Sequence, residues 1–303
     1  MNDLAVLLLA YGAPNSQEDI EPYFTDIMHG HKPSPELLKD LKERYRKIGR
    51  RSPLLDITMA QASALEERLR SHAVNARVYV GMKHWHPYIR EVVPRIVDDG
   101  FNRIIALALA PHYSGIGIGG YKQALDQALE GNSQVTVDFV DGWYDNPVFH
   151  QAVAEKVTKA LKQFQNSKVE IIFTAHSLPE RIIRDNDPYP KQLEASCQSV
   201  ADILKLDHWS LAYQSAGHGG EKWLGPDILE ALQQLSNHKE HSDNVLVVPI
   251  GFVADNLEIL FDLDVEAQDF ARSHGLSLKR TESLNTSPTL ISALADVVQK
   301  RIS

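Results

Sequence analysis

The sequence has little cysteine and no long apolar run. Its one cysteine, Cys197, excludes an internal disulfide, a cysteine-ligated iron–sulfur cluster and a cysteine-based zinc site, and it is typical of a reducing compartment. No stretch approaches the ~20 apolar residues that span a bilayer. The apolar run after Met1-Asn2-Asp3 lacks a basic flank and is too short for a signal peptide. We therefore expect a cytoplasmic protein without a membrane span.

Basic residues are also fewer than acidic ones. The chain has 31 Lys and Arg against 40 Asp and Glu, a net charge of −9. This argues against nonspecific binding to nucleic acid or anionic membranes, because both need a positive surface. What is present, 43% apolar and 23% charged residues, is typical of a globular protein. At ~100–200 residues per domain, the 303 residues predict two lobes.

Short apolar runs alternate with amphipathic segments of helical length. The runs are residues 4–10, 76–80, 104–110, 135–140, 168–174, 209–213 and 245–250. Apolar strands separated by helices indicate parallel sheets buried on both faces, so the predicted fold class is α/β. A turn-rich stretch at 141–147 predicts a boundary between an N-terminal domain, 1–147, and a C-terminal domain, 148–285. Residues 286–303 are expected to form a final helix that packs back on the lobes.

The two halves share a local pattern at an offset of 165 residues. Residues 10–14 are Ala-Tyr-Gly-Ala-Pro and residues 175–179 are Ala-His-Ser-Leu-Pro, each after an apolar run. Because the match is short, chance explains it as well as an internal duplication does. Duplication would place Tyr11 and His176 at matching strand ends, where open α/β sheets bind ligands, and both would face one cleft between the lobes.

One histidine and one acidic row could carry chemistry. His176 follows a buried strand, and a neutral imidazole there could bind a metal or accept a proton; the alternative is a histidine bonded within a turn. Glu258, Asp262 and Glu266 recur every four residues and so share one helix face, which Asp255 could cap. A divalent cation would relieve the repulsion of such carboxylates; the alternative is a solvated acidic face.

A basic segment and a glycine-rich segment are further candidates. Residues 39–51 hold seven basic residues against two acidic ones and could bind carboxylate or phosphate, unless they are a solvated helix face. Residues 115–120 satisfy G-x-G-x-x-G, which supports a rival interpretation, a dinucleotide-binding oxidoreductase. Residues 111–114 separate the predicted strand from the glycines, whereas the dinucleotide-binding fingerprint needs a tight turn directly after the strand. This counts against the oxidoreductase interpretation.

Taken together, these segments resemble the ferrochelatases, enzymes that insert ferrous iron into a porphyrin. The resemblance covers essentially the whole chain, and the Ala-His-Ser-Leu-Pro segment is its most specific motif. The segments that carry it are 10–14, 44–45, 52–54, 81–84, 109–114, 174–179, 187–190, 213–215, 223–226 and 251–258. The family fold implies two Rossmann-like lobes, each a parallel sheet flanked by helices, with a porphyrin cleft between them.

The resemblance implies roles for the candidate residues. His176 and Glu258 match the family's catalytic pair, two residues that face each other across the porphyrin centre and ligate the metal. Insertion exchanges two pyrrole protons for one divalent metal, so both a base and a metal ligand are needed. Asp262 and Glu266 match outer cation-binding positions that would pass metal inward. Fe²⁺ is then a substrate, with no permanently bound cofactor and no iron–sulfur cluster.

The substrate is indicated by the Ala-Tyr-Gly-x-Pro form of residues 10–14, which resembles the coproporphyrin-type enzymes of Gram-positive lineages. In those enzymes the tyrosine that matches Tyr11 can ligate the porphyrin iron. By motif position, Arg44, Tyr45, Ser52 and Tyr121 would also contact porphyrin. Coproporphyrin bears four propionates, which would give the basic segment around Arg44 a purpose.

The sequence departs from the coproporphyrin-type pattern at two positions. Many of those relatives have arginine at Met28, where His29 or His31 could substitute as a propionate contact. Many also have histidine at Asn256, just before Leu257-Glu258. The first departure bears on propionate binding, and neither affects His176 or Glu258.

The expected activity is insertion of Fe²⁺ into coproporphyrin III, which gives coproheme and two protons in heme biosynthesis. We expect a monomer that makes transient contact with neighbouring heme-synthesis enzymes and binds no nucleic acid. The alternatives are a protoporphyrin IX ferrochelatase, a chelatase that prefers cobalt, and a non-catalytic tetrapyrrole carrier.

Overall fold

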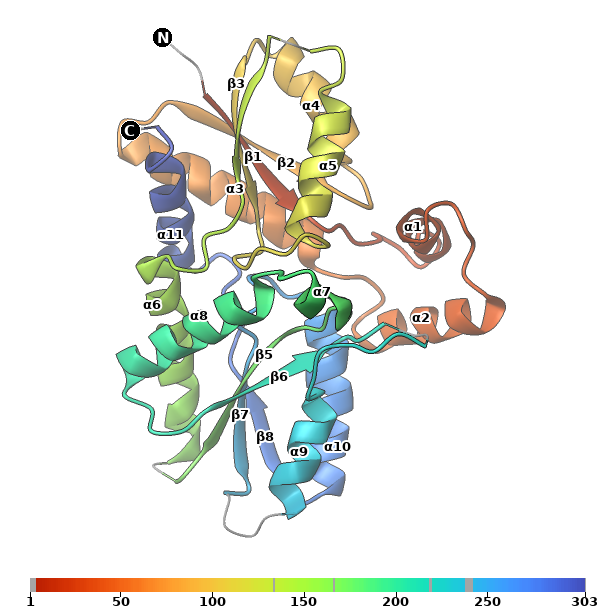
Figure 1. The fold of residues 1–303 in the computed structure, drawn as a ribbon, viewed down its shortest axis with the longest axis vertical. Coiled ribbons are helices and arrows are strands. Elements are labelled where there is room, and N and C mark those ends of the chain that lie inside the picture. The colour runs from red at the N-terminus through yellow and green to blue at the C-terminus, as the bar shows by residue number, and fades with distance from the viewer. Residues whose placement is uncertain (1–3, 133, 166, 218–219, 238–241, 303) are drawn as a thin grey trace. The chain divides into compact units, whose positions relative to one another are not determined.

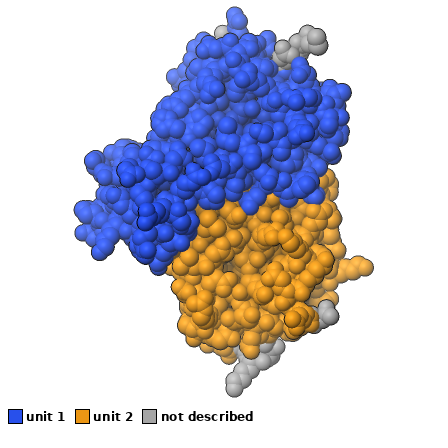
Figure 2. All heavy atoms as spheres, turned by 180° about the vertical axis from the view of Figure 1, so that it is seen from behind, with its two compact units in different colours: residues 1–146, 285–303 blue, residues 147–284 orange. Residues whose placement is uncertain are grey.

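The computed structural model describes residues 4–132, 134–165, 167–217, 220–237 and 242–302. The chain divides into two compact units, coloured separately in Figure 2. Unit 1 is Met1–Asn146 with Asn285–Ser303, and unit 2 is Pro147–Leu284. Residues 1–3, which entered the signal-peptide argument, lie outside the described part. Within that part, no helix has both the length and the apolar character needed to cross a membrane.

Unit 1 is built on a four-stranded parallel sheet with strand order β2-β1-β3-β4. The strands are β1 (Leu4–Ala10), β2 (Ala76–Met82), β3 (Arg103–Ala108) and β4 (Thr136–Val140). In the register of the sheet, Leu7 lies opposite Tyr79 on β2 and Ala106 on β3. Every residue of β1 is buried, as the continuous apolar run predicts for a strand covered on both faces.

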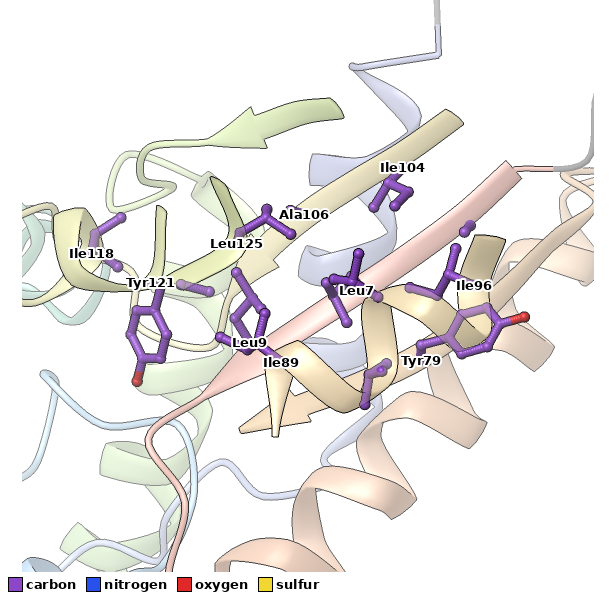
Figure 3. Packing of buried hydrophobic residues seen from close by; sticks show 14 residues of the cluster. Leu7, Leu9, Tyr79, Ile89, Ile96, Ile104, Ala106, Ile118, Tyr121 and Leu125 are labelled. Carbon is purple, nitrogen blue, oxygen red and sulfur yellow. The ribbon is translucent and has the colours of Figure 1, made fainter. Parts of the chain in front are cut away.

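The helices of unit 1 are α1 (Ile20–Ile27), α2 (Pro35–Lys47), α3 (Leu54–Ser71), α4 (Ile89–Asp98), α5 (Ile118–Ala128) and α11 (Pro288–Gln299). α4 and α5 pack over one face, where Ile89 and Leu125 close on Leu7 and Leu9 (Figure 3). α3 packs beside β2, and the C-terminal helix α11 packs against α3 (Figure 1).

Unit 2 has its own four-stranded parallel sheet, with strand order β6-β5-β7-β8. The strands are β5 (Glu170–His176), β6 (Ser210–Gln214), β7 (Asn244–Val248) and β8 (Ser277–Arg280). The helices are α6 (Pro147–Leu161), η1 (Lys162–Phe164), α7 (Arg181–Arg184), α8 (Tyr189–Leu204), α9 (Ile228–Asn237), η2 (Ile259–Ala267) and α10 (Gln268–Ser273). α9, η2 and α10 share one apolar cluster with the face of the sheet that carries Ile172 and Ala212.

The two sheets have the same topology. In each unit the first strand lies between the second and the third, and the fourth lies outside the third (Figure 1). The strand order reverses beside the first strand, and open α/β sheets bind ligands outside the carboxyl ends of the strands at such a point. Tyr11 follows β1 directly, and His176 is the last residue of β5. The shared topology agrees with the local repeat in the sequence.

The glycine-rich segment does not form a dinucleotide-binding turn. β3 ends at Ala108 and α5 begins only at Ile118, so a long loop replaces the tight turn of that fingerprint. The hydroxyl of Ser114 accepts a hydrogen bond from the Gly117 amide at 2.8 Å, and its carbonyl accepts one from Gly119 at 3.0 Å. Ser114 thus satisfies the amides that a pyrophosphate would need, and the oxidoreductase interpretation loses its support.

Candidate functional site

His176 lies at the carboxyl end of β5 and has one ring nitrogen committed to the backbone. Its Nδ1 donates to the carbonyl of Ser177 at 2.5 Å, which leaves the Nε2 lone pair as the acceptor. The hydroxyl of Tyr189 donates to the His176 carbonyl at 2.9 Å and fixes the backbone. Burial lowers the pKa of His176, although the Ser177 carbonyl and Asp262 act in the opposite direction. The imidazole is therefore neutral at neutral pH.

Glu258 directly precedes η2, and Asn256 caps this helix. The side-chain oxygen of Asn256 accepts a hydrogen bond from the Ile259 amide at 2.9 Å. The sequence assigned this cap to Asp255, whose carboxylate accepts a bond from the Ser283 hydroxyl at 2.6 Å. Asn256 has the spacing to Ile259 that an N-cap side chain requires, whereas Asp255 is drawn toward residues after β8.

Asp262 and Glu266 of the acidic row lie on a π-helix, with Glu258 directly before it, rather than on the α-helix that their spacing suggested. Helices with i→i+5 hydrogen bonds are rare and occur frequently at functional sites. Along the row Glu258 is partly buried, Asp262 is only 6% exposed and Glu266 is exposed. Burial of Asp262 contradicts the alternative of a solvated acidic face. Burial also raises the pKa of Glu258, so its carboxyl holds a proton more readily than an exposed one does.

Gln214 and Ser215, at the end of β6, connect His176 to this row. The carbonyl of Gln214 accepts from the Ser177 amide at 2.7 Å, and its side-chain amide donates to the Glu258 carbonyl at 3.2 Å. The hydroxyl of Ser215 donates to the Asp262 carboxylate. These hydrogen bonds therefore link the segments that carry His176, Glu258 and Asp262 at the edge of a single sheet. Sequence reasoning gave Gln214 and Ser215 no role, although they end a predicted strand.

A glycine lets the loop after β7 pass close to the end of β5. The Gly251 amide donates to the Thr174 carbonyl at 3.1 Å. A Cβ atom at Gly251 would lie 2.6 Å from the Cβ of Ala175 and 3.6 Å from the backbone nitrogen of His176. Only a residue without a side chain fits here, so Gly251 brings the segment that leads to Glu258 against the strand that carries His176.

A second group of candidates lies at the carboxyl end of the sheet in unit 1. Tyr11 is 40% exposed, and its ring centre lies 4.6 Å from that of His84. Nδ1 of His84 donates to Asp26 at 2.9 Å, and burial lowers the pKa of His84 despite that carboxylate. The ammonium of Lys83 lies 5.8 Å from the ring centre of Tyr121, and burial lowers the pKa of Lys83. Tyr11 and Tyr121 thus flank Lys83 and His84, which sequence reasoning quoted only within a motif.

Comparison with known proteins decides the family. The ferrochelatase family model matches residues 3–302. A ferrochelatase of Herpetosiphon aurantiacus is 42% identical over 299 residues, 97% of each chain. A coproporphyrin III ferrochelatase of Geobacillus kaustophilus is 42% identical over 301 residues, 98% of this chain and 95% of the relative. The chain belongs to the ferrochelatase family. It is an enzyme, a lyase of heme biosynthesis whose substrates are iron and a porphyrin.

Solved structures of other chelatases share the fold of this ferrochelatase. SirB from Bacillus subtilis with Fe³⁺ aligns with a TM-score of 0.62 at 10% identity and covers 98% of this chain and 95% of its own. CbiX, the terminal enzyme of siroheme biosynthesis in denitrifying bacteria, aligns with a TM-score of 0.58 at 12% identity over the whole of both chains. These similarities confirm the predicted α/β fold of two Rossmann-like lobes.

The other predicted porphyrin contacts of the ferrochelatase differ in their accessibility. Arg44 is partly buried and pairs with Asp40 at 2.8 Å. Tyr45, the next residue of α2, is only 1% exposed and belongs to the packed interior of unit 1. Ser52 is 7% exposed, and its hydroxyl accepts from the Leu54 amide at 3.3 Å. Arg44 is thus the accessible member of this set, and porphyrin contact at all three stays a prediction.

Both departures from the coproporphyrin-type pattern have a local structural setting. Asn256 uses its side chain to cap η2. Met28 is the C-cap residue of α1, and the exposed residues His29 and His31 follow it. Their imidazoles are accessible to an anionic group from solvent.

His176, Glu258 and Asp262 carry an imidazole and two carboxylates, which are ligand types that suit Fe²⁺ and similar ions. His176 and Glu258 are also groups that can accept protons. In the described parts of the chain, no three or more His, Cys, Asp or Glu side chains are arranged to hold a metal ion.

Proposed function

We propose that this ferrochelatase inserts Fe²⁺ into coproporphyrin III through His176 and Glu258, giving coproheme and two protons. The observation that carries the proposal is the hydrogen-bonded group at the end of β5 and β6. It fixes the Nδ1–H tautomer of His176 and ties the residues before and within η2 to the same strand end. A base and a metal ligand are thereby supported by one rigid edge of the sheet.

The proposed chemistry is an exchange of one cation for two protons. The two pyrrole N–H groups of the porphyrin lose their protons, and the four pyrrole nitrogens then bind Fe²⁺, so charge is conserved. Nε2 of His176 has its lone pair available to accept a pyrrole proton or to hold the metal before transfer. The Glu258 carboxylate is the second ligand and the second proton acceptor, a role that suits its raised pKa.

Asp262 and Glu266 are the proposed metal path. Glu266 is exposed and Asp262 is buried, so the acidic row extends from solvent into the protein. Carboxylate oxygens bind divalent cations, and a site that supplies few such ligands leaves the cation only partly coordinated. An ion captured at Glu266 would pass by Asp262 toward Glu258 and His176.

The choice of coproporphyrin III rests on the first unit and on the relatives. Tyr11 is accessible at the end of β1 and would ligate the iron of the product. Arg44 and the basic segment around it would bind propionates, with Ser52, Tyr45 and Tyr121 as further contacts. Several relatives with about this degree of identity are named coproporphyrin III ferrochelatases.

The experiment that tests the substrate is anaerobic Fe²⁺ insertion with coproporphyrin III and protoporphyrin IX measured side by side. We expect a higher kcat/KM for coproporphyrin III. Arg44→Met should raise KM for coproporphyrin more than for protoporphyrin, because the latter has fewer carboxylates. Arg70→Met, in α3 and with an exposed side chain, is the control and should change neither value. A preference for protoporphyrin would overturn the choice of substrate and leave the roles of His176 and Glu258 standing.

The cytoplasm is the proposed compartment, and Fe²⁺ is proposed to be a substrate with no resident cofactor. Both proposals rest on the single cysteine and the chemistry of the site. We further propose that the enzyme acts as a monomer and meets neighbouring heme-synthesis enzymes only transiently.

A further inference from the structure

Arg280 is a charged residue of unit 2 whose side chain lies mostly inside the protein. It is the last residue of β8 and lies opposite Val247 of β7 in the sheet. Its side chain is only 12% exposed. An arginine this deeply buried needs carboxylate and carbonyl partners for its five N–H donors, because an unpaired buried charge is strongly destabilising.

The partners of Arg280 lie on both sides of Glu258 in the sequence. Its Nε and Nη2 donate to the two carboxylate oxygens of Asp264, inside η2, at 2.7 and 2.6 Å. Its Nη1 lies 3.4 Å from the carboxylate of Asp255, which precedes η2, and also donates to the Ser283 hydroxyl at 3.2 Å. Ser283 in turn donates to Asp255 at 2.6 Å, which closes the group.

This arrangement fixes the helix at two points and constrains what lies between them. The bond to Asp264 is bidentate, so it restricts direction as well as distance, and lysine could not reproduce it. The i→i+5 hydrogen bonding of η2 is uncommon and needs support from outside the helix. Residues at the end of β6 supply such support through Glu258 and Asp262, and Arg280 supplies it from the end of β8.

We propose that Arg280 is a positioning residue for metal insertion: by holding Asp255 and Asp264 it sets the π-helical register and so the placement of Glu258 relative to Asp262. The proposal rests on the proposed function of Glu258. Arg280 touches neither porphyrin nor metal in this account, and its effect reaches the reaction only through the helix.

The test compares the Arg280→Lys, Arg280→Met and Asp264→Asn variants and the Asp264→Asn/Arg280→Met double variant. For each we would measure kcat and KM for Fe²⁺, the porphyrin Kd without metal, and Tm. We expect kcat to fall about 10- to 100-fold, the scale of a small misplacement of a reacting group, with the porphyrin Kd unchanged. Because both side chains act through one link, the double variant should lose no more than the worse single variant. Arg272→Met, which breaks an exposed pair with Asp269, is the control and should match wild type.

Wild-type kcat and KM for Fe²⁺ in folded Arg280→Lys and Asp264→Asn would overturn the proposal. A lower Tm in these variants with unchanged kinetics would also overturn it. So would a loss of kcat in the double variant equal to the combined losses of the two single variants. If the Arg280 variants do not fold, Asp264→Asn decides, because Asp264 is 36% exposed and asparagine keeps its size. Glu258→Gln and His176→Ala, measured in parallel, separate the two proposals. Wild-type turnover in these two variants would contradict the proposed function. Loss of turnover in both, together with wild-type turnover in Asp264→Asn, would contradict only the role of Arg280.

Discussion

At the scale of single residues, the site depends on side chains that hold one another in place. His176 has Nδ1 bound to a backbone carbonyl, and Asp262 accepts a bond from the Ser215 hydroxyl. Metal-binding histidines commonly fix their tautomer in this way, which leaves the other nitrogen for the metal. The chemistry we assign to His176 and Asp262 therefore rests on neighbours that do no chemistry themselves.

Ser215→Ala tests this dependence. The substitution removes a hydrogen-bond donor from a carboxylate that is only 6% exposed. We expect the free energy of unfolding to fall by about 1–3 kcal/mol and KM for Fe²⁺ to rise, because Asp262 loses a bond that orients it. Urea unfolding and steady-state kinetics measure the two effects.

Ser199→Ala is the control for that substitution. The Ser199 hydroxyl donates to the Ala195 carbonyl on the exposed side of α8, so its loss should change stability by less than about 0.5 kcal/mol. Equal behaviour of the two variants would show that Ser215 does not orient Asp262.

The residues found from sequence and those missed differ in what reveals them. His176 and the row Glu258, Asp262 and Glu266 stand out through their type and spacing along the chain. Gln214 and Arg280 do not, because their roles depend on which strand lies next to which, and strand register is set by tertiary structure. The family resemblance included the segment 213–215 among its motifs but implied no function for Gln214.

At the scale of elements, seven of the strands follow apolar runs and were predicted at nearly their observed limits. β8 was not predicted, because Ser-Leu-Lys-Arg is short, largely polar and at the edge of its sheet. The π-helical form of η2 was not predicted either. Its composition would suit an α-helix equally well, and the hydrogen bonds that hold Asp262 and Asp264 come from distant strands. Local pattern cannot reveal such contacts.

Gly251→Ala tests how closely the element after β7 must approach β5. The added methyl group would meet the Cβ of Ala175 at 2.6 Å and its Cα at 2.8 Å, so the backbone must shift. We expect a loss of about 1–3 kcal/mol in the free energy of unfolding. Because the shift also moves the backbone next to His176, kcat should fall in the protein that remains folded.

Gly220→Ala provides the comparison, since no atom of the described residues lies within 4 Å of a Cβ atom at that position. It should change neither Tm nor kcat. A Gly251→Ala variant with the stability and turnover of the Gly220→Ala variant would contradict the close approach.

At the scale of the whole molecule, one topology occurs twice and carries different chemistry in each unit. The first strand of unit 1 leads to Tyr11, a porphyrin-facing candidate, and the first strand of unit 2 leads to His176, the metal-insertion candidate. Open α/β sheets place ligands at these strand ends. The alternation of strands and helices predicted this architecture, whereas the assignment of roles came from the motifs at the strand ends.

The central claim is that His176 takes part in insertion rather than in porphyrin binding. The most direct measurement is anaerobic Fe²⁺ insertion by His176→Ala, with porphyrin affinity determined separately and His208→Ala, an exposed histidine of the same unit, as control. We predict that turnover falls at least about 100-fold in His176→Ala, the typical effect of losing a general base, while the porphyrin Kd and the His208→Ala rates stay at wild-type values. Wild-type turnover by a folded His176→Ala variant would contradict the account.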